Sequence, residues 1–294
     1  KYLSDKLLQK VVELADESLE KYDTQEKQTT LYKDLFADDD TRDDLKNTLV
    51  DTLSYDIEPA YLFNVLVEQA KQNLFQLTDL NKAFIYLSTS YSQFSGLFDD
   101  VDLQSKKLGT DDQQRNVTIT EVLKKLNDID VLGHDGDVIG DAYEYLIGQF
   151  ASDAGKKAGE FYTPHMVSDM MARIVAIGQE DTHIFNVYDP TMGSGSLMLN
   201  VRNHVNYPDK VKYHGQELNT TTFNLAKMNL ILHGVDNEAM NLRNGDTLNK
   251  DWPTDEPYTF DSVVMNPPYT ANWSADNTFL DDSRFNKYGK LAPK

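Results

Sequence analysis

The 294-residue sequence contains no cysteine, so neither a disulfide framework nor a thiolate metal site can form. The histidines show no close metal-ligand spacing, and we expect no metal; they stand at positions 134, 165, 183, 204, 214 and 233. Long apolar runs are also missing: none approaches the roughly 18 residues that span a bilayer, and no signal peptide is visible. These absences predict a soluble, cytoplasmic protein without membrane association.

Basic residues are scarce as well. The chain has 28 Lys and Arg against 48 Asp and Glu, a formal net charge of −20. Residues 1–150 carry 15 basic and 30 acidic side chains, whereas residues 151–294 carry 13 and 18. Because a protein that grips nucleic acid by itself usually shows a basic face, any such affinity must come from a local patch or from a partner subunit. The alternative is that the acidity serves only solubility.

The residues that are present suffice for a packed core. Hydrophobic residues make up 40% of the chain and aromatic residues 11%, which excludes wholesale disorder. The length suits about two domains. The first residue is not methionine and the last residues show no closing element, so we interpret the sequence as part of a longer protein.

The first part of the chain, residues 1–152, predicts an all-helical domain. Apolar residues recur at helical spacing from the start, at Leu3, Leu7, Val11 and Leu14. A further helix is predicted over 60–72, with Pro59 in its first turn. Two more are predicted over 80–91, capped by Thr78 or Asp79, and over 121–128, capped by Thr118 or Thr120. A last one is predicted over 137–151, with these residues on its apolar side: Ile139, Ala142, Tyr143, Leu146, Ile147 and Phe150. The acidic stretches 38–40 and 43–44 predict solvated loops or helix starts.

The pattern changes in residues 153–294, where strands and helices alternate. Strands are predicted over 184–188, 212–216, 239–243 and 260–265, and helices over 196–205 and 221–233. This alternation predicts an α/β fold with a parallel, doubly wound sheet, in which ligands bind beyond the carboxyl ends of the strands. Polar residues follow all four predicted strands: Asp189, Glu217, Asp246 and Asn266.

The first of these strand ends opens a glycine-rich loop, Asp189-Pro-Thr-Met-Gly-Ser-Gly-Ser196. Gly193 and Gly195 allow a tight turn and a close approach of a ligand to the backbone, although a plain strand–helix turn would explain them too. The third glycine of the dinucleotide pattern is replaced by Met198, and no phosphate-binding Gly-Lys-Ser/Thr is present. The acidic Asp189 disfavours a phosphate and suits the ammonium group of an amino-acid moiety.

The next two strand ends complete a binding pattern. Glu217 lies 28 residues after Asp189, where an acidic side chain can accept from both hydroxyls of a ribose. Asp246 can accept from an adenine amino group. Each acid alone could be a helix N-cap. Together with Asp189, they indicate a pocket for an adenosine that carries an amino acid, which is S-adenosylmethionine.

The last strand end is Asn266-Pro267-Pro268-Tyr269. The lone pair of an arylamine is delocalised into its ring, so the amine is a poor nucleophile. Two acceptors, the Asn266 side-chain oxygen and the Pro267 carbonyl, would localise that lone pair toward an incoming methyl group, and proline fixes the backbone that presents the carbonyl. Tyr269 offers a flat face on which a base can stack. The alternative is a Pro-Pro strand exit without function.

With these motifs in place, the chain resembles the S-adenosylmethionine-dependent DNA adenine-N6 methyltransferases, most closely the modification (M) subunit of type I restriction–modification systems. The family's methionine-binding segment resembles Gly159-Glu160-Phe161-Tyr162-Thr163-Pro164-His165. Its glycine loop resembles residues 189–195, including Ser194 before the helix-starting Ser196, and its ribose-binding acid resembles Glu217. Its catalytic motif resembles Asn266, Pro267, Pro268 and Tyr269, and its helical domain resembles 141–146. Thr191 and Met192 replace the usual small residues, for which we expect altered packing rather than lost binding.

The resemblance implies a Rossmann-like class I methyltransferase sheet after the helical domain, incomplete at its C-terminus. It implies methyl transfer to N6 of an adenine flipped out of duplex DNA. The implied partners are a specificity subunit, a second M subunit and an ATP-driven restriction subunit. Arg284, Lys287, Lys290 and Lys294 form a basic cluster that we expect near DNA phosphates.

Two other readings remain open at this point. The same Asn-Pro-Pro-Tyr motif serves methyltransferases that act on protein glutamine or on RNA guanine. A scaffold that binds S-adenosylmethionine without catalysis is a further possibility. The DNA target sequence does not follow from this chain.

Overall fold

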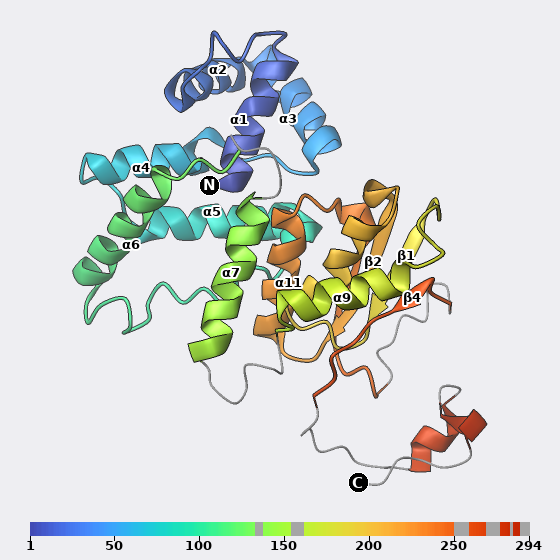
Figure 1. The fold of residues 1–294 in the computed structure, drawn as a ribbon. Coiled ribbons are helices and arrows are strands. Elements are labelled where there is room, and N and C mark those ends of the chain that lie inside the picture. The colour runs from blue at the N-terminus through green and yellow to red at the C-terminus, as the bar shows by residue number, and fades with distance from the viewer. Residues whose placement is uncertain (133–137, 154–161, 250–258, 269–276, 283–284, 289–294) are drawn as a thin grey trace.

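The computed structural model describes residues 1–132, 138–153, 162–249, 259–268, 277–282 and 285–288. A helical part, blue to green in Figure 1, lies beside a parallel sheet that is covered by helices. Both parts of the fold class predicted from the sequence are confirmed. No helix among the described residues combines the length and the apolar character needed to cross a membrane.

Six helices form the N-terminal part: α1 (Tyr2–Leu14), α2 (Gln25–Ala37), α3 (Asp39–Leu53), α4 (Phe63–Lys71), α5 (Leu77–Ser90) and α6 (Asp112–Asn127). Side chains cap three of them, because Thr24, Asp38 and Asp111 accept backbone N–H groups at the starts of α2, α3 and α6. The acidic stretch 38–40 is therefore a helix start. Leu7, Leu8 and Val11 of α1 are fully buried in the core of this part.

Buried tyrosines tie this helical core together. The Tyr32 hydroxyl donates to the Ile57 carbonyl at 2.8 Å, and the hydroxyls of Tyr86 and Tyr91 both donate to the buried carboxylate of Asp56. Burial is the main cause that raises the pKa of the Tyr91 hydroxyl to about 12, and the adjoining Asp56 adds to it. These tyrosines serve helix packing.

The predicted start of the fourth helix is wrong. Pro59 begins a short 3-10 turn, Pro59–Tyr61, and α4 starts only at Phe63. Between them Leu62 is extended and fully buried, and the Phe63 N–H donates to the Ser4 hydroxyl of α1 at 2.9 Å. A tertiary contact therefore interrupts what local propensity favours as one helix.

The predicted starts of α5 and α6 are also wrong. α5 begins at Leu77, with neither Thr78 nor Asp79 as its cap. α6 begins at Asp112, and Thr118 lies inside it, where its hydroxyl donates to the Gln114 carbonyl at 3.0 Å. A threonine inside a helix can form such a bond, and the sequence pattern does not distinguish an interior threonine from an N-cap threonine.

Within the described residues the sheet has four parallel strands, β1 (Phe185–Asp189), β2 (Val211–Glu217), β3 (Met240–Asn244) and β4 (Ser262–Val263), in the order β3-β2-β1-β4. The strand order reverses at β1, which is the point where open α/β sheets bind ligands. One face is covered by α9 (His165–Ala176), α10 (Ser196–Leu199) and α11 (Thr220–Leu232). Phe185, Val187 and Tyr213 lie in the core between them.

Two predicted elements of the sheet part are shorter than expected. The helix predicted over 196–205 ends at Leu199 and continues as a 3-10 helix, Asn200–His204. The buried Asn200 amide, which donates to the Ser168 hydroxyl at 2.7 Å, ties this turn to α9. The strand predicted over 260–265 is regular only at Ser262–Val263, although the N–H groups of Asp261 and Val264 on either side still donate to β1; before it, the Asp261 carboxylate takes the Asn186 N–H at 2.7 Å.

Helix α7 (Val138–Asp153) was predicted at nearly these bounds, but its buried side differs from the prediction. Ile147 is buried as predicted, but Leu146 is 48% exposed and Ala142 is exposed, and Glu144, which was not predicted on the apolar side, is buried. A carboxylate on the inner face of a helix calls for a partner, and α7 packs against α11, which supplies one.

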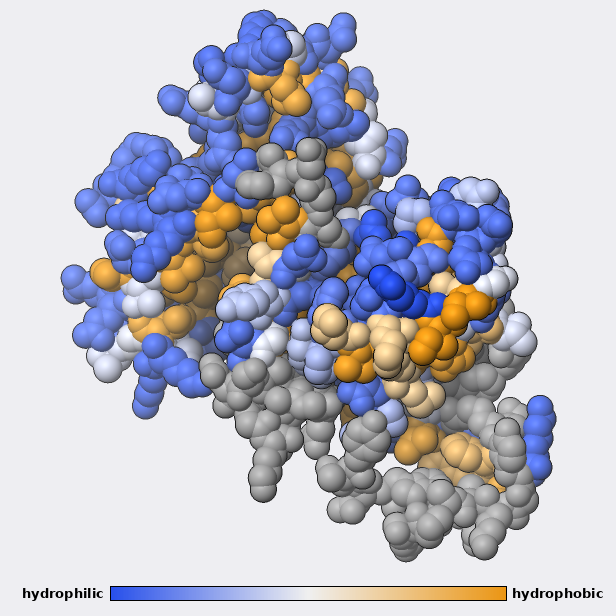
Figure 2. Space-filling model, in the orientation of Figure 1, coloured by the Kyte–Doolittle hydropathy of each residue, from blue (hydrophilic) through white to orange (hydrophobic). Residues whose placement is uncertain are grey.

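The outer side of α9 is apolar. Met166, Met170, Ile174 and the C-cap residue Ile177 are all more than half exposed. Figure 2 shows orange and pale orange surface over this helix. The helical part is mostly blue in the same view. An apolar face of this kind is typical of surfaces that pack against further protein.

Helix α11 belongs to both cores. Ala226 and Leu230 are fully buried against the sheet, while Met228 and Ile231 pack on the helical part. At its outer end the Asn224 amide donates to the Gly96 carbonyl at 3.0 Å. The two parts of the chain are therefore held together through one helix.

We predict that Leu230→Ala lowers the free energy of unfolding by about 2–5 kcal/mol, because it opens a cavity next to the sheet. Chemical denaturation measures this. Ile85→Ala, at a position 53% exposed on α5, is the control and should change stability by less than about 0.5 kcal/mol. Equal effects of the two substitutions would contradict the central place of α11.

Candidate active site

The candidate site lies at the carboxyl edge of the sheet. Asp189 is the last residue of β1 and Glu217 the last of β2, and Asn266 follows β4 by three residues. In the parallel register Asp189 lies opposite Gly215 and Tyr188 opposite Val263, so these strand ends meet at one edge. Sequence reasoning predicted this convergence.

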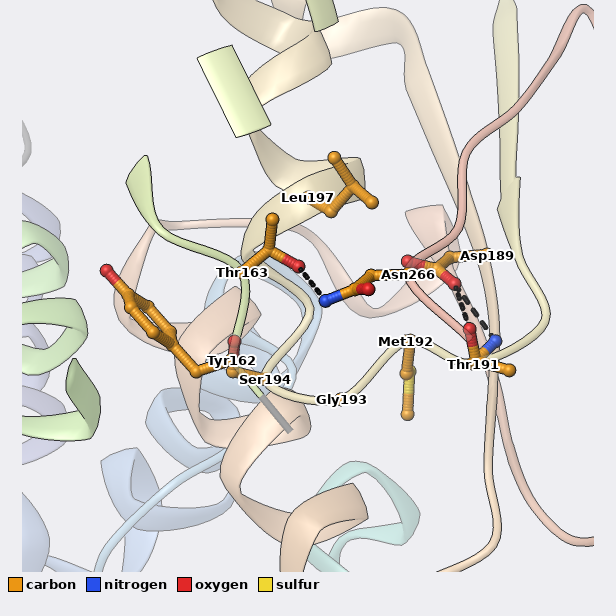
Figure 3. Close-up of a pocket in the computed structure, with 9 residues that line it drawn as sticks. All are labelled: Tyr162, Thr163, Asp189, Thr191, Met192, Gly193, Ser194, Leu197 and Asn266. Atoms are coloured by element: carbon orange, nitrogen blue, oxygen red, sulfur yellow. Dashed lines mark hydrogen bonds between the residues drawn. The ribbon is translucent and has the colours of Figure 1, made fainter. Parts of the chain in front are cut away.

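A pocket of about 230 Å³ opens at this edge. Figure 3 shows its lining, which comes from the segment before α9, the end of β1, the glycine loop, α10 and the residue after β4: Tyr162, Thr163, Asp189, Thr191, Met192, Gly193, Ser194, Leu197 and Asn266. Six of these nine are predicted site residues. Thr191, Met192 and Leu197 are additions, and their place within or beside the glycine loop was the available signal.

The glycine loop has the backbone that its sequence predicts. Gly193 has φ 54° and Gly195 has φ 79°, both in the left-handed region that favours glycine. The Gly195 N–H donates to the Met192 carbonyl at 2.7 Å, which closes the turn. A Cβ at Gly195 would lie 2.9 Å from a methyl of Leu230, so the end of that side chain would have to shift to admit any side chain there.

Met192 is accommodated by a second glycine. Its side chain is buried, and its sulfur would lie 2.4 Å from a Cβ built at Gly215 on β2. The Met192 N–H also donates to the Gln216 carbonyl at 2.9 Å. Gly215 thus leaves the space that the Met192 side chain occupies. Sequence reasoning missed Gly215, although a glycine within a predicted strand signals a close approach.

The loop is held from behind by Asn229 of α11. Its amide nitrogen lies 3.1 Å from the Ser194 carbonyl, 3.4 Å from the Ser196 hydroxyl and 3.3 Å from the Glu144 carboxylate of α7. Asn229 is fully buried, and Ser196 lies behind the pocket rather than in its lining. Sequence reasoning missed Asn229 and Glu144; a polar residue on the apolar side of a predicted helix was the only signal.

Asp189 is almost completely buried, with 1% of its surface exposed. Burial raises the pKa of its carboxyl to about 7, and the charge of Glu217 adds to this. The N–H and hydroxyl of Thr191 donate to it and partly oppose the shift, with the N–H at 2.9 Å. A cation in the pocket would hold Asp189 in its charged form.

Glu217 lies beside this pocket and grips the loop. Its two oxygens accept the Gly193 N–H at 3.1 Å and the Asn219 N–H at 2.8 Å. Burial raises the pKa of its carboxyl, and the backbone N–H donors oppose that shift. Glu217 therefore lies close enough to Gly193 to contact a ligand that binds over this glycine.

Asn266 faces the segment before α9. Its amide nitrogen donates to the Thr163 hydroxyl at 3.3 Å, across 103 residues of sequence.

Tyr162 packs its ring 3.5 Å from the position of a Cβ on Gly148 of α7. Burial raises the pKa of the Tyr162 hydroxyl, and the charge of Glu144 adds to it.

The other predicted residues that the structure describes do not line the pocket. Asp246 is exposed and its carboxylate accepts the Leu248 N–H at 3.0 Å. Pro164 and His165 are exposed where α9 begins, and Pro267 and Pro268 are exposed after Asn266. Glu160, Phe161, Tyr269, Arg284, Lys290 and Lys294 lie outside the described residues, and Lys287 is exposed.

The arrangement defines a class of protein. A parallel sheet that reverses at β1, a glycine loop after β1 and an acid after β2 form a Rossmann-like methyltransferase fold. Comparison with known families is more specific. The model of the N-6 DNA Methylase family matches residues 134–294, and that of the HsdM N-terminal domain matches residues 1–126. The chain belongs to the N-6 DNA methylase family.

Individual relatives agree with this assignment. The chain is 37% identical to the type I restriction enzyme MpnII methylase subunit of Mycoplasma pneumoniae, over 89% of this chain and 52% of that one. A type I methylase subunit of Methanocaldococcus jannaschii, MjaVII, is 29% identical over 72% of this chain and 35% of its own length. The chain thus spans about half the length, or less, of these relatives.

A solved structure is similar over the whole chain. The type I restriction-modification system methyltransferase subunit of Streptococcus thermophilus superimposes with a TM-score of 0.93 at 50% identity. It covers 100% of this chain, which corresponds to 61% of that subunit. The helical part and the sheet part are therefore arranged as they are in that protein.

We predict that Asp189→Asn removes a pH dependence of stability. The native carboxyl has a pKa of about 7 and an ordinary one 3.8, so the unfolded state gives up its proton first as pH rises. Wild-type stability therefore falls between about pH 4 and pH 7, and the variant should gain on the wild type by roughly 2–4 kcal/mol over that range. Urea unfolding at several pH values measures this.

The matched control for this experiment is Asp209→Asn, at an exposed position. It should keep the wild-type pH profile. Parallel profiles of Asp189→Asn and the wild type would show that the buried carboxyl titrates normally and would contradict the prediction.

Proposed function

We propose that the protein to which this chain belongs transfers a methyl group from S-adenosylmethionine to N6 of an adenine flipped out of duplex DNA. One observation carries the proposal: Asn266 and the buried Asp189 line the same pocket beside the glycine loop. A group that binds an arylamine and a group that binds a cation thus face one small space. Membership of the N-6 DNA methylase family supports the same reaction.

The cofactor side is assigned to carboxylates. Asp189, with its raised pKa, would pair with the ammonium group of the amino-acid end, and Glu217 would accept from the ribose hydroxyls. Each carboxylate oxygen has more than one lone pair, so Glu217 can keep its backbone donors while it binds a ribose. The adenosine would extend past Glu217 toward Asp246.

The remaining predicted cofactor residues surround this position. Tyr162, Thr163 and Ser194 line the pocket, and Gly193 and Gly195 allow the backbone to approach the ligand. Glu160, Phe161, Pro164, His165 and Ser196 stay predictions from the family resemblance. When bound, the cofactor supplies an electrophilic methyl group on a sulfonium.

The acceptor side is assigned to Asn266 and Pro267. The Asn266 side-chain oxygen and the Pro267 carbonyl would accept from the two N–H groups of the adenine amine, which turns its lone pair toward the methyl group. Pro268 holds the backbone and Tyr269 would stack on the flipped base, worth about 1–3 kcal/mol. Asn266 has no basic group, so the amine proton leaves after methyl attack and passes to water.

Partners follow from the charge and from the relatives. A chain with a net charge of −20 repels the phosphates of DNA, so a partner would have to hold the DNA. Relatives of this chain are subunits of type I restriction enzymes. We propose a specificity subunit that delivers the DNA, a second methylase subunit, and an ATP-driven restriction subunit, in the cytoplasm where DNA is. Lys287 and the basic residues around it would approach phosphates.

The helical domain is proposed to end at residue 152 and the catalytic domain to begin at 153.

The decisive experiment is transfer of tritium from labelled S-adenosylmethionine to duplex DNA by the full-length protein, with and without its specificity subunit. Nucleoside analysis then identifies the product. N6-methyladenine supports the proposal. Labelled protein or RNA would support the alternative substrates instead, and binding of the cofactor without transfer would indicate a scaffold.

We predict that Asn266→Ala abolishes methylation, by at least about 100-fold, while the Kd for S-adenosylmethionine changes less than about threefold. Its amide would contact the acceptor amine rather than the cofactor, and interactions made only in the transition state lower the rate alone. Radiolabel transfer and calorimetry measure the two quantities. Asn237→Ala, at an exposed asparagine, is the control and should keep both. Near-normal turnover of Asn266→Ala would overturn the assignment.

We predict that Gly195→Ala weakens cofactor binding by at least about tenfold. A left-handed backbone costs a residue with a Cβ about 1–2 kcal/mol, and here the Cβ also meets Leu230 at 2.9 Å. Gly178→Ala is a matched control, since Gly178 has φ 77° and a Cβ there meets nothing within 4 Å. It should lower stability but leave the Kd unchanged. Equal Kd values for both variants would contradict the role of the loop.

A further inference from the structure

One peptide group of the glycine loop is held from both sides. It joins Ser194, which lines the pocket, to Gly195. Its carbonyl oxygen accepts from the Asn229 amide of α11 at 3.1 Å, and its N–H donates to the Met192 carbonyl at 2.7 Å. Because a peptide group is planar, these two hydrogen bonds together fix the orientation of its plane.

The residue after this peptide group explains why its plane needs to be held. Gly195 has φ 79°, and glycine adopts positive and negative φ about equally well. A rotation of the peptide group changes φ of Gly195, so the glycine permits it. Such a rotation would move the Ser194 carbonyl away from Asn229 and change the shape of the loop beside the pocket. The hydrogen bond from Asn229 therefore favours one loop shape among those that glycine allows.

The Asn229 amide can hold this carbonyl in only one orientation. A backbone carbonyl accepts hydrogen bonds and never donates them, so the nitrogen end of the amide must face Ser194. The same nitrogen lies 3.3 Å from the Glu144 carboxylate of α7, and its two hydrogens can serve both oxygens at once. The Ser196 hydroxyl, at 3.4 Å, can donate or accept and does not decide the orientation. Glu144 thus supports the orientation that Ser194 requires.

Burial makes this arrangement matter for the loop. Asn229 is fully buried, and Glu144 and Ser194 are buried as well. If the amide is removed, a buried carbonyl and a buried carboxylate lose a donor at once. The present loop shape then becomes less favourable than shapes in which the Ser194 carbonyl reaches water.

Helix α7 supports a second part of the pocket. Gly148 follows Glu144 by one turn of α7, and the ring of Tyr162 packs 3.5 Å from the position of a Cβ on this glycine. Tyr162 lines the pocket, as Ser194 does. Since α7 also packs beside α11 (Figure 1), the glycine loop and the segment before α9 are both supported by one helix.

We propose that Asn229 and Glu144 are positioning residues for S-adenosylmethionine. Asn229, oriented by Glu144, holds the peptide group between Ser194 and Gly195 and so keeps the glycine loop in the shape that binds the cofactor. Both residues lie behind the pocket lining and act through the loop. The inference rests on the proposed methyl transfer from this cofactor and deepens it, because cofactor affinity then depends on α7.

A matched control lies on the same helix as Asn229. The Asn224 amide also donates to a backbone carbonyl, that of Gly96 at 3.0 Å, and to a carboxylate, that of Asp100 at 2.9 Å. These two partners belong to the helical part of the chain. Asn224→Ala therefore removes the same kind of amide from α11 while the glycine loop keeps its hydrogen bonds.

The test measures the Kd for S-adenosylmethionine by calorimetry with the full-length protein. In Asn229→Ala the Kd should rise at least about fivefold, because the apparent affinity falls with the fraction of molecules whose loop has the binding shape. In Asn224→Ala the Kd should stay within about twofold of the wild type. Equal Kd values for the two variants, whether both are raised or both are normal, would overturn the proposal.

Glu144 provides further variants in case Asn229→Ala impairs folding. Glu144→Ala removes the acceptor and should raise the Kd about threefold, whereas Glu144→Gln keeps an acceptor oxygen and should stay within about twofold of the wild type. The double variant of Glu144→Ala and Asn229→Ala should have the Kd of Asn229→Ala alone, because Glu144 acts through the amide. Effects that multiply would show that the two residues act separately and would contradict the proposal.

Kinetics separate positioning from a general loss of structure. Methylation of duplex DNA is measured with the specificity subunit present, over a range of S-adenosylmethionine concentrations. In Asn229→Ala the KM for S-adenosylmethionine should rise together with the Kd, while the rate at saturating cofactor falls by less than about twofold, since bound cofactor restores the loop shape. A lower saturating rate at an unchanged KM would refute the positioning role.

Failure of the proposed function gives a different result. A wild-type protein that binds S-adenosylmethionine but makes no N6-methyladenine contradicts the proposed reaction, and the Kd values of the variants still decide the inference. A wild-type protein that binds no S-adenosylmethionine contradicts both.

Discussion

The structure depends on how closely helix α11 approaches the glycine loop. A methyl of Leu230 lies 2.9 Å from the position of a Cβ at Gly195, and the buried Asn229 amide holds the Ser194 carbonyl at 3.1 Å. The same helix packs Met228 and Ile231 on the helical part. Because interiors are close-packed and transmit small shifts, the shape of the loop and the placement of the helical part are set together. This connection gives an acidic helical part a physical link to the site beside it.

The chemistry of the site follows from burial. Asp189 is placed at the end of a strand where water is excluded, and this burial raises its pKa to about 7. A pocket that contains such a carboxyl favours a cationic ligand, since the ligand restores the charge that burial disfavours. Asn266 shares the pocket with Asp189 and carries no charge of its own.

The sequence alone predicts much of this site. Asp189, Glu217 and Asn266 were predicted at strand ends, and parallel strands bring their carboxyl ends to one edge whatever the details of packing. The helix starts were less predictable. α4 begins late because Leu62 is buried in an extended form, and α6 begins early although Thr118 looked like a cap. At α4 a tertiary contact outweighs the local preference for helix. At α6 the helix extends before the threonine that resembles an N-cap.

Residue type and spacing are enough to predict the Asn-Pro-Pro-Tyr and glycine-loop motifs, their order and the alternation that implies a parallel sheet. Which residues lie behind these motifs depends on tertiary packing. Gly215 makes room for Met192, Glu144 and Asn229 support the loop, and Thr163 meets Asn266 across 103 residues. Contacts of this kind depend on distances between elements that no local pattern encodes. The physical reason is that packing in three dimensions, rather than neighbourhood along the chain, selects the partner of a buried polar group.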